Sequence, residues 1–345
     1  MYVLWCGETI ARRITYRVLT GLVVLGGLLA ACTDVHQGAP SVPQVGRAIV
    51  VPQLLPSSTP TPYAFNYRTI DDPKSKTFTR LGGIDDLAQV VGSVAIQPNG
   101  ATAAFTSARP YRTFFAIPYP NAKSTIATAV NPGGRIVVGY FVSRKDRETR
   151  GFLRENGIYA TFVSPKTPKG TRSVNELLGV NDNEIAVGFY RDQHGNDHPY
   201  EVAYGVFVEI TPPGAVSATA DAISYAGNVA GSERLKDGTT VGWLLRAGIY
   251  VQFAYPNSKT TLVNGLSDAL SGNRVVGSYV DGHGTHGFIL TAPGDPLKEA
   301  WQSVDEPNAK RVTVITGMNN HHDITGWYVD AEGRTHGFVG AVKGR

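Results

Sequence analysis

The fold of this chain is indicated most clearly by residues 130–139, VNPGGRIVVG, which read as a turn followed by a strand that ends in glycine. Variants of this phrase occur six times, and their final glycines are Gly92, Gly139, Gly188, Gly231, Gly277 and Gly326. Successive glycines lie 47, 49, 43, 46 and 49 residues apart. A period in this range indicates a repeat architecture.

Two further marks recur with each glycine, in a fixed order. The first is an aromatic residue 11–13 positions later, at Phe105, Phe152, Tyr200, Trp243, Phe288 and Phe338. The second is a proline that closes an aromatic or β-branched run, at Pro73, Pro120, Pro165, Pro212, Pro256 and Pro307. Three marks in one order, six times over, predict six equivalent units.

Each unit is expected to contain about four short strands. In the fifth copy we place them at residues 273–280, 286–290, 301–304 and 311–316. The turns at residues 281–284 and 330–333 contain Asp, which binds turn amides, and Gly, which allows positive φ. Four strands in roughly 45 residues match the size of one β-propeller blade.

The two ends of the array predict that it closes into a ring. The sixth unit stops after Phe338 without its aromatic-to-proline strand, and a spare strand at residues 65–70 stands before the first unit. Pairing the spare strand with the last unit would remove two open sheet edges. We therefore expect an all-β, six-bladed β-propeller over residues 63–345, closed by its N-terminal strand. The alternative is an open β-solenoid, which needs separate caps and does not explain the displaced strand.

The residues before the repeats carry an export signal. Three arginines precede an apolar run at residues 18–31, which is shorter than the ~20 residues that a membrane-spanning helix needs. The run ends in Leu29-Ala30-Ala31-Cys32, which resembles a bacterial lipobox. Residues 1–31 are therefore expected to be a lipoprotein signal peptide, with Cys32 lipidated as the first residue of the mature chain. Ordinary signal cleavage after Ala31 is the alternative.

Residues 32–62 are rich in proline and serine and are expected to form a flexible tether. Lipidation of Cys32 would make a membrane the first partner and would place the protein in the cell envelope, at the outer membrane or the cell surface. A net charge of +4 with both signs interspersed contains no basic block, so nucleic acid is not an expected partner. We expect a monomer.

The turn phrase, together with Thr285-His286-Gly287-Phe288 and Thr335-His336-Gly337-Phe338, resembles the bacterial extracellular HAF repeat family, which is named for a His-Ala-Phe mark. In this chain glycine replaces the alanine. Three copies have Ala103, Arg150 or Val241 in place of the histidine, and a fourth has a shifted version, His198-Pro199-Tyr200. The resemblance covers residues 65–340. It implies an exported repeat protein and no particular reaction.

Histidine pairs have the spacing of metal ligands at His283 with His286, and at His321 with His322. However, His286 and His336 occupy one slot of different repeats, and other copies place Ala103, Arg150 or Val241 there. Strand architecture explains such a slot better than a metal shell does. We therefore expect no metal site and no cofactor.

Acidic pairs occur at Asp71-Asp72, Asp85-Asp86 and Asp305-Glu306. A glycosidase needs two carboxyls ~5–9 Å apart on facing elements, whereas neighbours on a strand point apart. We interpret these pairs as turn residues and assign no catalytic residue. The best pointers to a binding surface are the departures from the repeat, at residues 143–150, 193–198 and 292–300.

These observations favour a non-enzymatic binding or scaffold module with a protein or carbohydrate ligand at a propeller face. The alternatives are a propeller hydrolase or lyase acting on carbohydrate, and a purely structural surface protein. An enzyme should gather unlike titratable groups within hydrogen-bond reach at one mouth of the ring. A scaffold should present repeat-equivalent side chains there.

Overall fold

The computed structural model describes residues 61–344 except 97–99, 171, 268–272 and 296–297. The chain divides into two units, Met1–Gln53 and Leu54–Arg345, and every described residue belongs to the second. The expected signal peptide, Cys32 and the tether as far as residue 60 lie outside the described residues. No helix that could span a bilayer occurs in the part of the chain that the structure describes.

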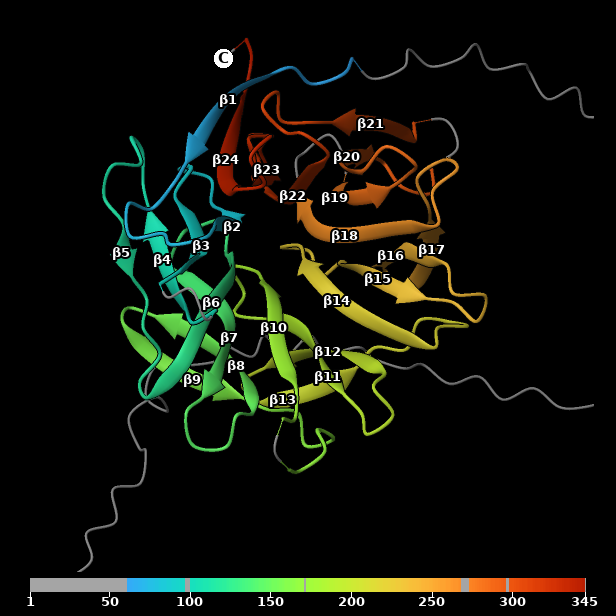
Figure 1. The fold of residues 1–345 in the computed structure, drawn as a ribbon. Coiled ribbons are helices and arrows are strands. Elements are labelled where there is room, and N and C mark those ends of the chain that lie inside the picture. Colours follow the sequence, from blue (N-terminus) through green and yellow to red (C-terminus); the bar gives the residue numbers. More distant parts are fainter. Residues whose placement is uncertain (1–60, 97–99, 171, 268–272, 296–297, 345) are drawn as a thin grey trace, which may run out of the picture. The chain divides into compact units, whose positions relative to one another are not determined.

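The described residues form six antiparallel blades of four strands each around a common axis (Figure 1). Blades 1 to 3 consist of β2 (Thr79–Ile84), β3 (Val90–Ala95), β4 (Thr102–Ser107) and β5 (Phe115–Ala116); β6 (Ala122–Val130), β7 (Ile136–Ser143), β8 (Thr149–Glu155) and β9 (Ile158–Phe162); and β10 (Asn175–Val180), β11 (Ala186–Arg191), β12 (Asp197–Ala203) and β13 (Val206–Glu209). The predicted propeller is confirmed, and the solenoid alternative is wrong.

Blades 4 to 6 continue the ring to the C-terminus. They consist of β14 (Ser217–Ile223), β15 (Val229–Arg234), β16 (Thr240–Arg246) and β17 (Ile249–Phe253); β18 (Thr260–Ser267), β19 (Arg274–Val280), β20 (Thr285–Thr291) and β21 (Ala300–Val304); and β22 (Val312–Met318), β23 (Ile324–Val329), β24 (Thr335–Val342) and β1 (Phe65–Ile70). Single parallel bridges, Thr240 to Thr260 and Thr285 to Val312, join these three blades into one continuous sheet.

The predicted grouping of strands in the fifth copy is wrong by one strand. The strand expected at residues 311–316 is β22, the innermost strand of blade 6, and blade 5 begins instead with β18. The marking prolines follow the outer strands, where the chain crosses to the next blade. A circular repeat can be cut at any strand, so its sequence period does not show where a blade begins.

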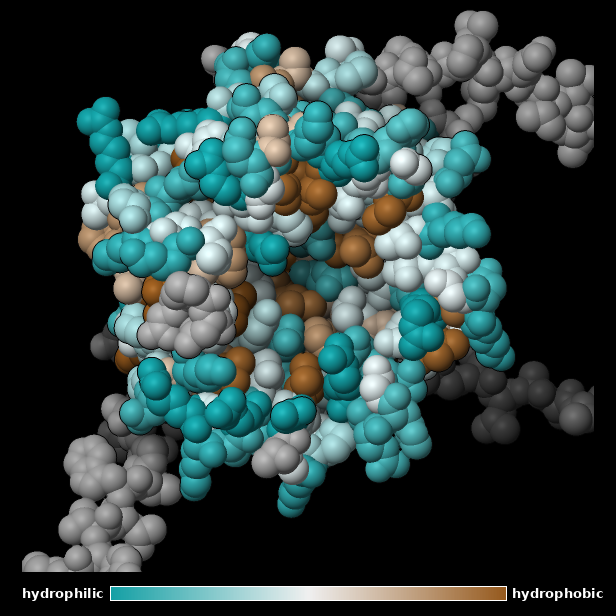
Figure 2. All heavy atoms as spheres, viewed as in Figure 1, coloured by the Kyte–Doolittle hydropathy of each residue, from teal (hydrophilic) through white to brown (hydrophobic). Residues whose placement is uncertain are grey.

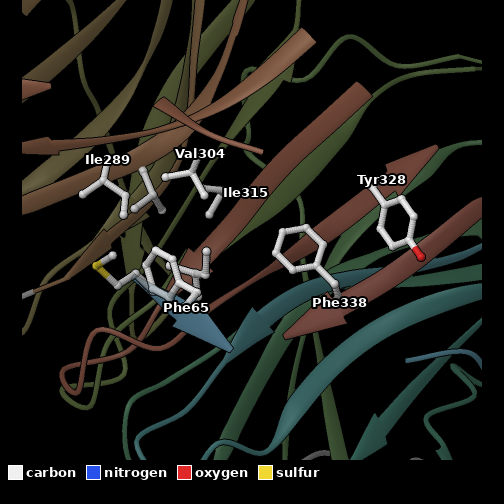
Figure 3. Close-up of a cluster of buried hydrophobic side chains, with 9 residues drawn as sticks. Phe65, Ile289, Val304, Ile315, Tyr328 and Phe338 are labelled. Carbon is white, nitrogen blue, oxygen red and sulfur yellow. The ribbon is translucent and has the colours of Figure 1, made fainter. Parts of the chain in front are cut away.

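The ring is closed by β1, as predicted. β1 pairs with β24 in antiparallel register from Phe65 opposite Val342 to Ile70 opposite Gly337. Phe65 inserts between blades 5 and 6, where it is buried among Ile289, Val304 and Ile315 (Figure 3). Burial of a Phe side chain contributes about 1.5–3 kcal/mol, so β1 adds apolar packing as well as hydrogen bonds.

The glycine and aromatic marks are cross-strand partners in every blade. The pairs are Gly92 with Phe105, Gly139 with Phe152, Gly188 with Tyr200, Gly231 with Trp243, Gly277 with Phe288, and Gly326 with Phe338. A Cβ at any of these glycines would collide with a carbonyl oxygen of the inner strand. In blades 1, 4, 5 and 6 the buried aromatic ring lies within 3.1 Å of this Cβ position, so the two marks form one packing unit.

The collision arises because every inner strand has a bulge at the same place. At this place one residue of each inner strand has no partner on the second strand, and these residues are Gly82, Thr128, Leu178, Asp221, Asn264 and Thr316. A bulge bends a strand and re-aims its side chains. Here the bulges bring five side chains and the backbone of Gly82 to the axis.

Candidate functional site

The six bulge residues form a ring around the axis, which we call the bulge ring. All six line a cavity of about 430 Å³. This volume lies within the range of ~300–1,000 Å³ that is usual for small-molecule pockets. The cavity opens at the hairpin end of the propeller, the end that carries the turns between the second and third strands of each blade. Figure 2 shows the centre of the described ring as a hollow with both hydrophilic and hydrophobic side chains.

The opposite end, which we call the turn end, holds the recurring turns between the first and second strands. There the axis is narrowed by a small-residue ring consisting of Gly83, Ala129, Gly179, Ala222, Gly265 and Gly317. A Cβ at Gly179 would lie 2.9 Å from the Cα of Ala222, and one at Gly265 would lie 3.1 Å from the Cα of Gly317. The inner strands therefore approach backbone to backbone, and a space of only about 70 Å³ remains.

Hydrogen bonds between neighbouring turns hold the turn end together. Asn181 Nδ2 donates to the carbonyl oxygen of Ser224 at 2.8 Å, and Asn319 Nδ2 donates to that of Asp85 at 3.0 Å. Each side-chain oxygen of these asparagines also accepts two amides of its own turn. The Asn of the repeat phrase therefore stabilises its own turn and the contact with the next blade.

At the hairpin end, unlike the turn end, equivalent positions of the six blades carry different kinds of side chain. Two residues before the bulge, the inner strands carry a mouth ring consisting of Arg80, Ile126, Glu176, Thr219, Leu262 and Val314. The side chain of Arg80 lines the cavity, and its guanidinium lies over the rings of Phe78 at 5.0 Å and Trp327 at 4.3 Å. Ser93, Thr102, Ser124 and Tyr140 add hydroxyl groups to the same wall.

Two carboxyl groups near this cavity have perturbed acidity. Burial raises the pKa of Asp221 to about 7, although Thr219 Oγ1 at 2.9 Å and Ser232 Oγ at 3.2 Å bond to its Oδ2. Burial also raises the pKa of Glu176 to about 7, although the charge of Arg191 opposes this shift. Both groups are therefore partly protonated near neutral pH, which reduces the negative charge of the mouth.

His286 and His336, the histidines of the Thr-His-Gly-Phe phrases, do not line this cavity, and each lies between carboxylates. His336 bonds through Nδ1 to Asp71 at 2.7 Å and through Nε2 to Asp330 at 3.0 Å, and its ring stacks on Tyr328. His286 bonds through Nδ1 to Asp305 at 2.9 Å and stacks on Tyr279. Burial lowers the pKa of both histidines, but their carboxylate partners outweigh it and the pKa is raised.

The same slot in blade 3 holds His198, which bonds to Asp192 at 3.1 Å and stacks on Tyr190. In blade 2 it holds Arg150, which pairs with Asp146 at 2.6 Å. In four of the six blades the slot therefore holds a basic side chain that bonds to a carboxylate of its own blade. Among the described residues, no group of three His, Cys, Asp or Glu side chains is arranged to hold a metal ion.

The acidic pairs lie in turns and at strand ends. Asp85 accepts the amides of Leu87 at 2.9 Å and Gln89 at 2.7 Å, and Asp86 accepts the amide of Asn320 at 2.9 Å. Asp72 and Glu306 are buried after the outer strands of neighbouring blades, and each accepts an amide two residues further on. Their hydrogen bonds are those of turn residues.

The predicted non-repeat loops lie at the edges of the blades and outside the axial cavity. Residues 143–150 span the turn from the end of β7 to the start of β8, beside a surface cavity of about 650 Å³. Residues 193–198 span the turn after β11 and the start of β12. The segment at residues 292–299 replaces the two-residue turns found at 156–157, 204–205 and 247–248. A further insertion, at residues 108–114 of blade 1, was not predicted; its Arg109 forms an ion pair with Asp323 of blade 6 at 3.0 Å.

The axial cavity is not among the site features predicted from the sequence, which are departures from the repeat. A signal for it exists within the repeat phrase. The residue before each small residue varies widely, as Gly, Thr, Leu, Asp, Asn or Thr, while the residue before it is always aliphatic and the residue after it is always Gly or Ala. A variable position inside a constant phrase marks a side chain that the fold itself does not require.

No family model and no curated protein sequence matches this chain. Among solved structures, it is similar to AofleA from Arthrobotrys oligospora, with 10% identity over 81% of this chain and 88% of that one and a TM-score of 0.52. It is also similar to a putative TolB from Agrobacterium tumefaciens, with 10% identity over 79% and 92% and a TM-score of 0.52. A third match is the fucose-specific lectin from Aleuria aurantia, with 13% identity over 80% and 97% and a TM-score of 0.51. These similarities establish the β-propeller fold.

Proposed function

We propose that this chain is a non-enzymatic binding module whose ligand enters the axial cavity from the hairpin end. The observation that carries this proposal is the contrast in side chains along the axis. All six blades contribute to the cavity, and their equivalent positions carry charged, hydroxyl, amide and aliphatic groups rather than one repeated residue. A purely structural ring has no need for that variety.

A carbohydrate suits this lining better than an apolar ligand does. The wall offers a guanidinium, several hydroxyls and the amide of Asn264, beside the aromatic rings of Phe78 and Tyr140. Sugars present hydroxyl groups along their edges and C–H groups on their faces, which match polar and aromatic groups respectively. One neighbour of the same fold is named a fucose-specific lectin, which supports testing carbohydrates first.

The proposal extends to the location of the protein. A lipid anchor at Cys32, as in an exported protein of the HAF repeat type, would hold the propeller at the cell envelope. Residues 61–64 precede β1 at the turn end, where the ring of Tyr63 lies 5.0 Å from that of His322. A ligand would therefore enter from the end of the propeller opposite to the end where the tether joins. Cys32→Ser should move the protein from the membrane fraction to the aqueous phase and remove its acyl mass.

The binding proposal is tested by filling the cavity. Ser124→Phe should block it, and the strand should tolerate the ring because Phe78 occupies the equivalent position in blade 1. Ser217 is the equivalent residue of blade 4 and is not among the residues that line the cavity, so Ser217→Phe is the matched control. Mature chains carrying Cys32→Ser would be compared on an array of envelope glycans. Equal binding by both variants, or no glycan bound by the parent, would contradict the proposal.

A carbohydrate hydrolase or lyase is the second candidate, favoured by one observation. Glu176 and Asp221, on neighbouring inner strands, have pKa values raised to about 7, and such groups can act as general acids. The hydrogen bonds of Asp221 run to hydroxyl groups, which gives no sign of a catalytic pair. Release of new reducing or unsaturated ends from bound glycans, abolished by Glu176→Gln or Asp221→Asn, would establish the enzyme instead.

A further inference from the structure

We infer that the axial cavity takes a sugar that bears an oxyanion, a carboxylate or a phosphate, and that Arg80 holds this group. The inference rests on the proposed function and names the chemical class of the ligand. It is based on the surroundings of Arg80, which lines the cavity and lies over two aromatic rings.

Several arginines near the hairpin end are neutralised by carboxylates. Arg150 pairs with Asp146 at 2.6 Å, Arg191 pairs with Asp197 at 2.7 Å, and Arg334 pairs with Asp330 at 3.1 Å. In the described part of the chain, no carboxylate lies within ion-pair distance of Arg80. Its charge is therefore available to a ligand in the cavity.

Two aromatic rings hold this guanidinium in place. Phe78 comes from the segment that leads into β2, and Trp327 comes from β23 of blade 6. Cation–π contacts of this kind orient the planar fork but leave its N–H groups free to donate. A guanidinium held in this way matches the two oxygens of a carboxylate or phosphate.

The wall next to Arg80 adds donors where an anion would sit. The hydroxyl oxygen of Thr102 is buried and has no hydrogen-bond partner among the described residues. Ser124 Oγ accepts the amide of Thr102 at 3.3 Å, which leaves its own proton free to donate. Burial also lowers the pKa of Arg80, a cost that a bound anion would offset.

The size and the other lining residues favour an anionic sugar over a bare ion. The cavity of about 430 Å³ extends from Arg80 across the axis to Leu178, Asp221 and Asn264. An inorganic ion at Arg80 would leave most of this space to solvent. A sugar ring can reach both the charged wall and the amide and carboxyl groups opposite.

The test measures binding of glucuronate, galacturonate, glucose 6-phosphate and glucose by calorimetry to the mature chain carrying Cys32→Ser. We expect at least one acidic sugar to bind about tenfold or more tightly than glucose. Arg80→Gln should remove this preference, Arg80→Lys should keep part of it, and Arg246→Gln, at an exposed arginine on β16, should keep all of it. Uronates bound without the phosphate would assign a carboxylate, and the reverse would assign a phosphate.

The outcomes separate this inference from the proposed function. Glucose bound as tightly as the acidic sugars, or an unchanged preference in Arg80→Gln, would overturn the inference and leave the binding module standing. A parent chain that binds no acidic sugar but binds neutral glycans on the array would do the same. A parent chain that binds neither would overturn both. Circular dichroism of each variant shows that loss of binding is not loss of fold.

Discussion

At the turn end of the axis the six inner strands carry glycine or alanine, whereas a few residues earlier the same strands carry an arginine, a glutamate, a threonine and three aliphatic residues. The two rings belong to the same strands and to the same repeat. They differ in what surrounds them. The small-residue ring touches backbone on the next blade, whereas Arg80 and Ile126 of the mouth ring line the cavity.

This difference separates two kinds of constraint on one repeat. Where backbones meet, a single added carbon has no space, so all six copies are held to the same residue type. Where a side chain lines the cavity, as at Arg80 or Asn264, we expect a change of residue to alter the cavity more than the packing. Positions whose residue varies between copies therefore indicate the binding surface, and positions whose residue is uniform indicate what the fold requires. The following predictions test that division, beginning with the largest expected effect.

The uniform end should not tolerate a larger residue. Gly179→Val would place its Cβ 2.9 Å from the Cα of Ala222 and from the carbonyl oxygen of Asp221. Both are backbone atoms, so two inner strands would have to separate, and we expect a loss of ~3 kcal/mol in the free energy of unfolding. Denaturant unfolding measures this change. Gly282→Val, in a hairpin turn with open space around it, is the control and should leave the midpoint nearly unchanged.

Loss of one turn-to-turn hydrogen bond should have a smaller effect. Asn319→Ala removes the bond to the carbonyl oxygen of Asp85 and leaves the amides of His321 and Asp323 without their acceptor. Because Asn319 is 4% exposed, we expect a cost of about 1–3 kcal/mol, seen as a lower melting temperature. Asn183→Ala removes an exposed bond to Tyr225 and should cost less. Equal effects would mean that burial does not set the strength of these contacts.

The stability of the protein should depend on pH because of two carboxyl groups near the cavity. Folding raises the pKa of Glu176 from 4.5 and of Asp221 from 3.8, each to about 7. A carboxyl with a raised pKa stabilises the fold while it is protonated, so this stability is present below about pH 4 and is lost as the pH rises to about 7. The double variant Glu176→Gln, Asp221→Asn should lose less stability over that range in denaturant titrations. Glu332→Gln, at an exposed turn, is the control, and an identical slope in all three proteins would contradict the raised pKa values.

The smallest effect is expected in the mouth ring. Leu262 is 38% exposed, so Leu262→Ser should change the free energy of unfolding by about 0.5 kcal/mol or less. Thermal unfolding would measure this change. A loss comparable with that of Gly179→Val would show that the fold requires the mouth ring, and would contradict the distinction between the two rings.

Much of the fold could be predicted because its marks are steric requirements. Gly277 and Phe288 recur at equivalent places because the bulge leaves no space for a Cβ and the ring fills what remains. The spare strand at residues 65–70 was recognisable because only one unit lacked its outer strand. The blade boundary was not predictable, because the proline marks a crossing between blades and the period alone gives no starting point.

The candidate site was less accessible to sequence reasoning. Arg80 and Trp327 lie far apart in the chain and in different blades, and nothing in their local sequence links them. The cavity depends on the bulges, and no residue type predicts where a bulge occurs. His286 stood out as a motif residue, yet its contacts with Asp305 and Tyr279 belong to the blade. The most prominent motif in the sequence therefore lies outside the proposed binding cavity.

The pairing of β1 with β24 also affects the order in which the blades assemble during folding. The first strand of the array has no hydrogen-bonding partner in its own neighbourhood and must find one at the far end of the chain. Five blades can assemble from contiguous sequence as it becomes available, but the sixth cannot, and joining distant segments is the slow step in folding. Until Val342 is available to Phe65, the array has a free edge at blade 6. Capture of the first strand should therefore be the last event in folding, and a chain arrested before it would be the species most prone to aggregate.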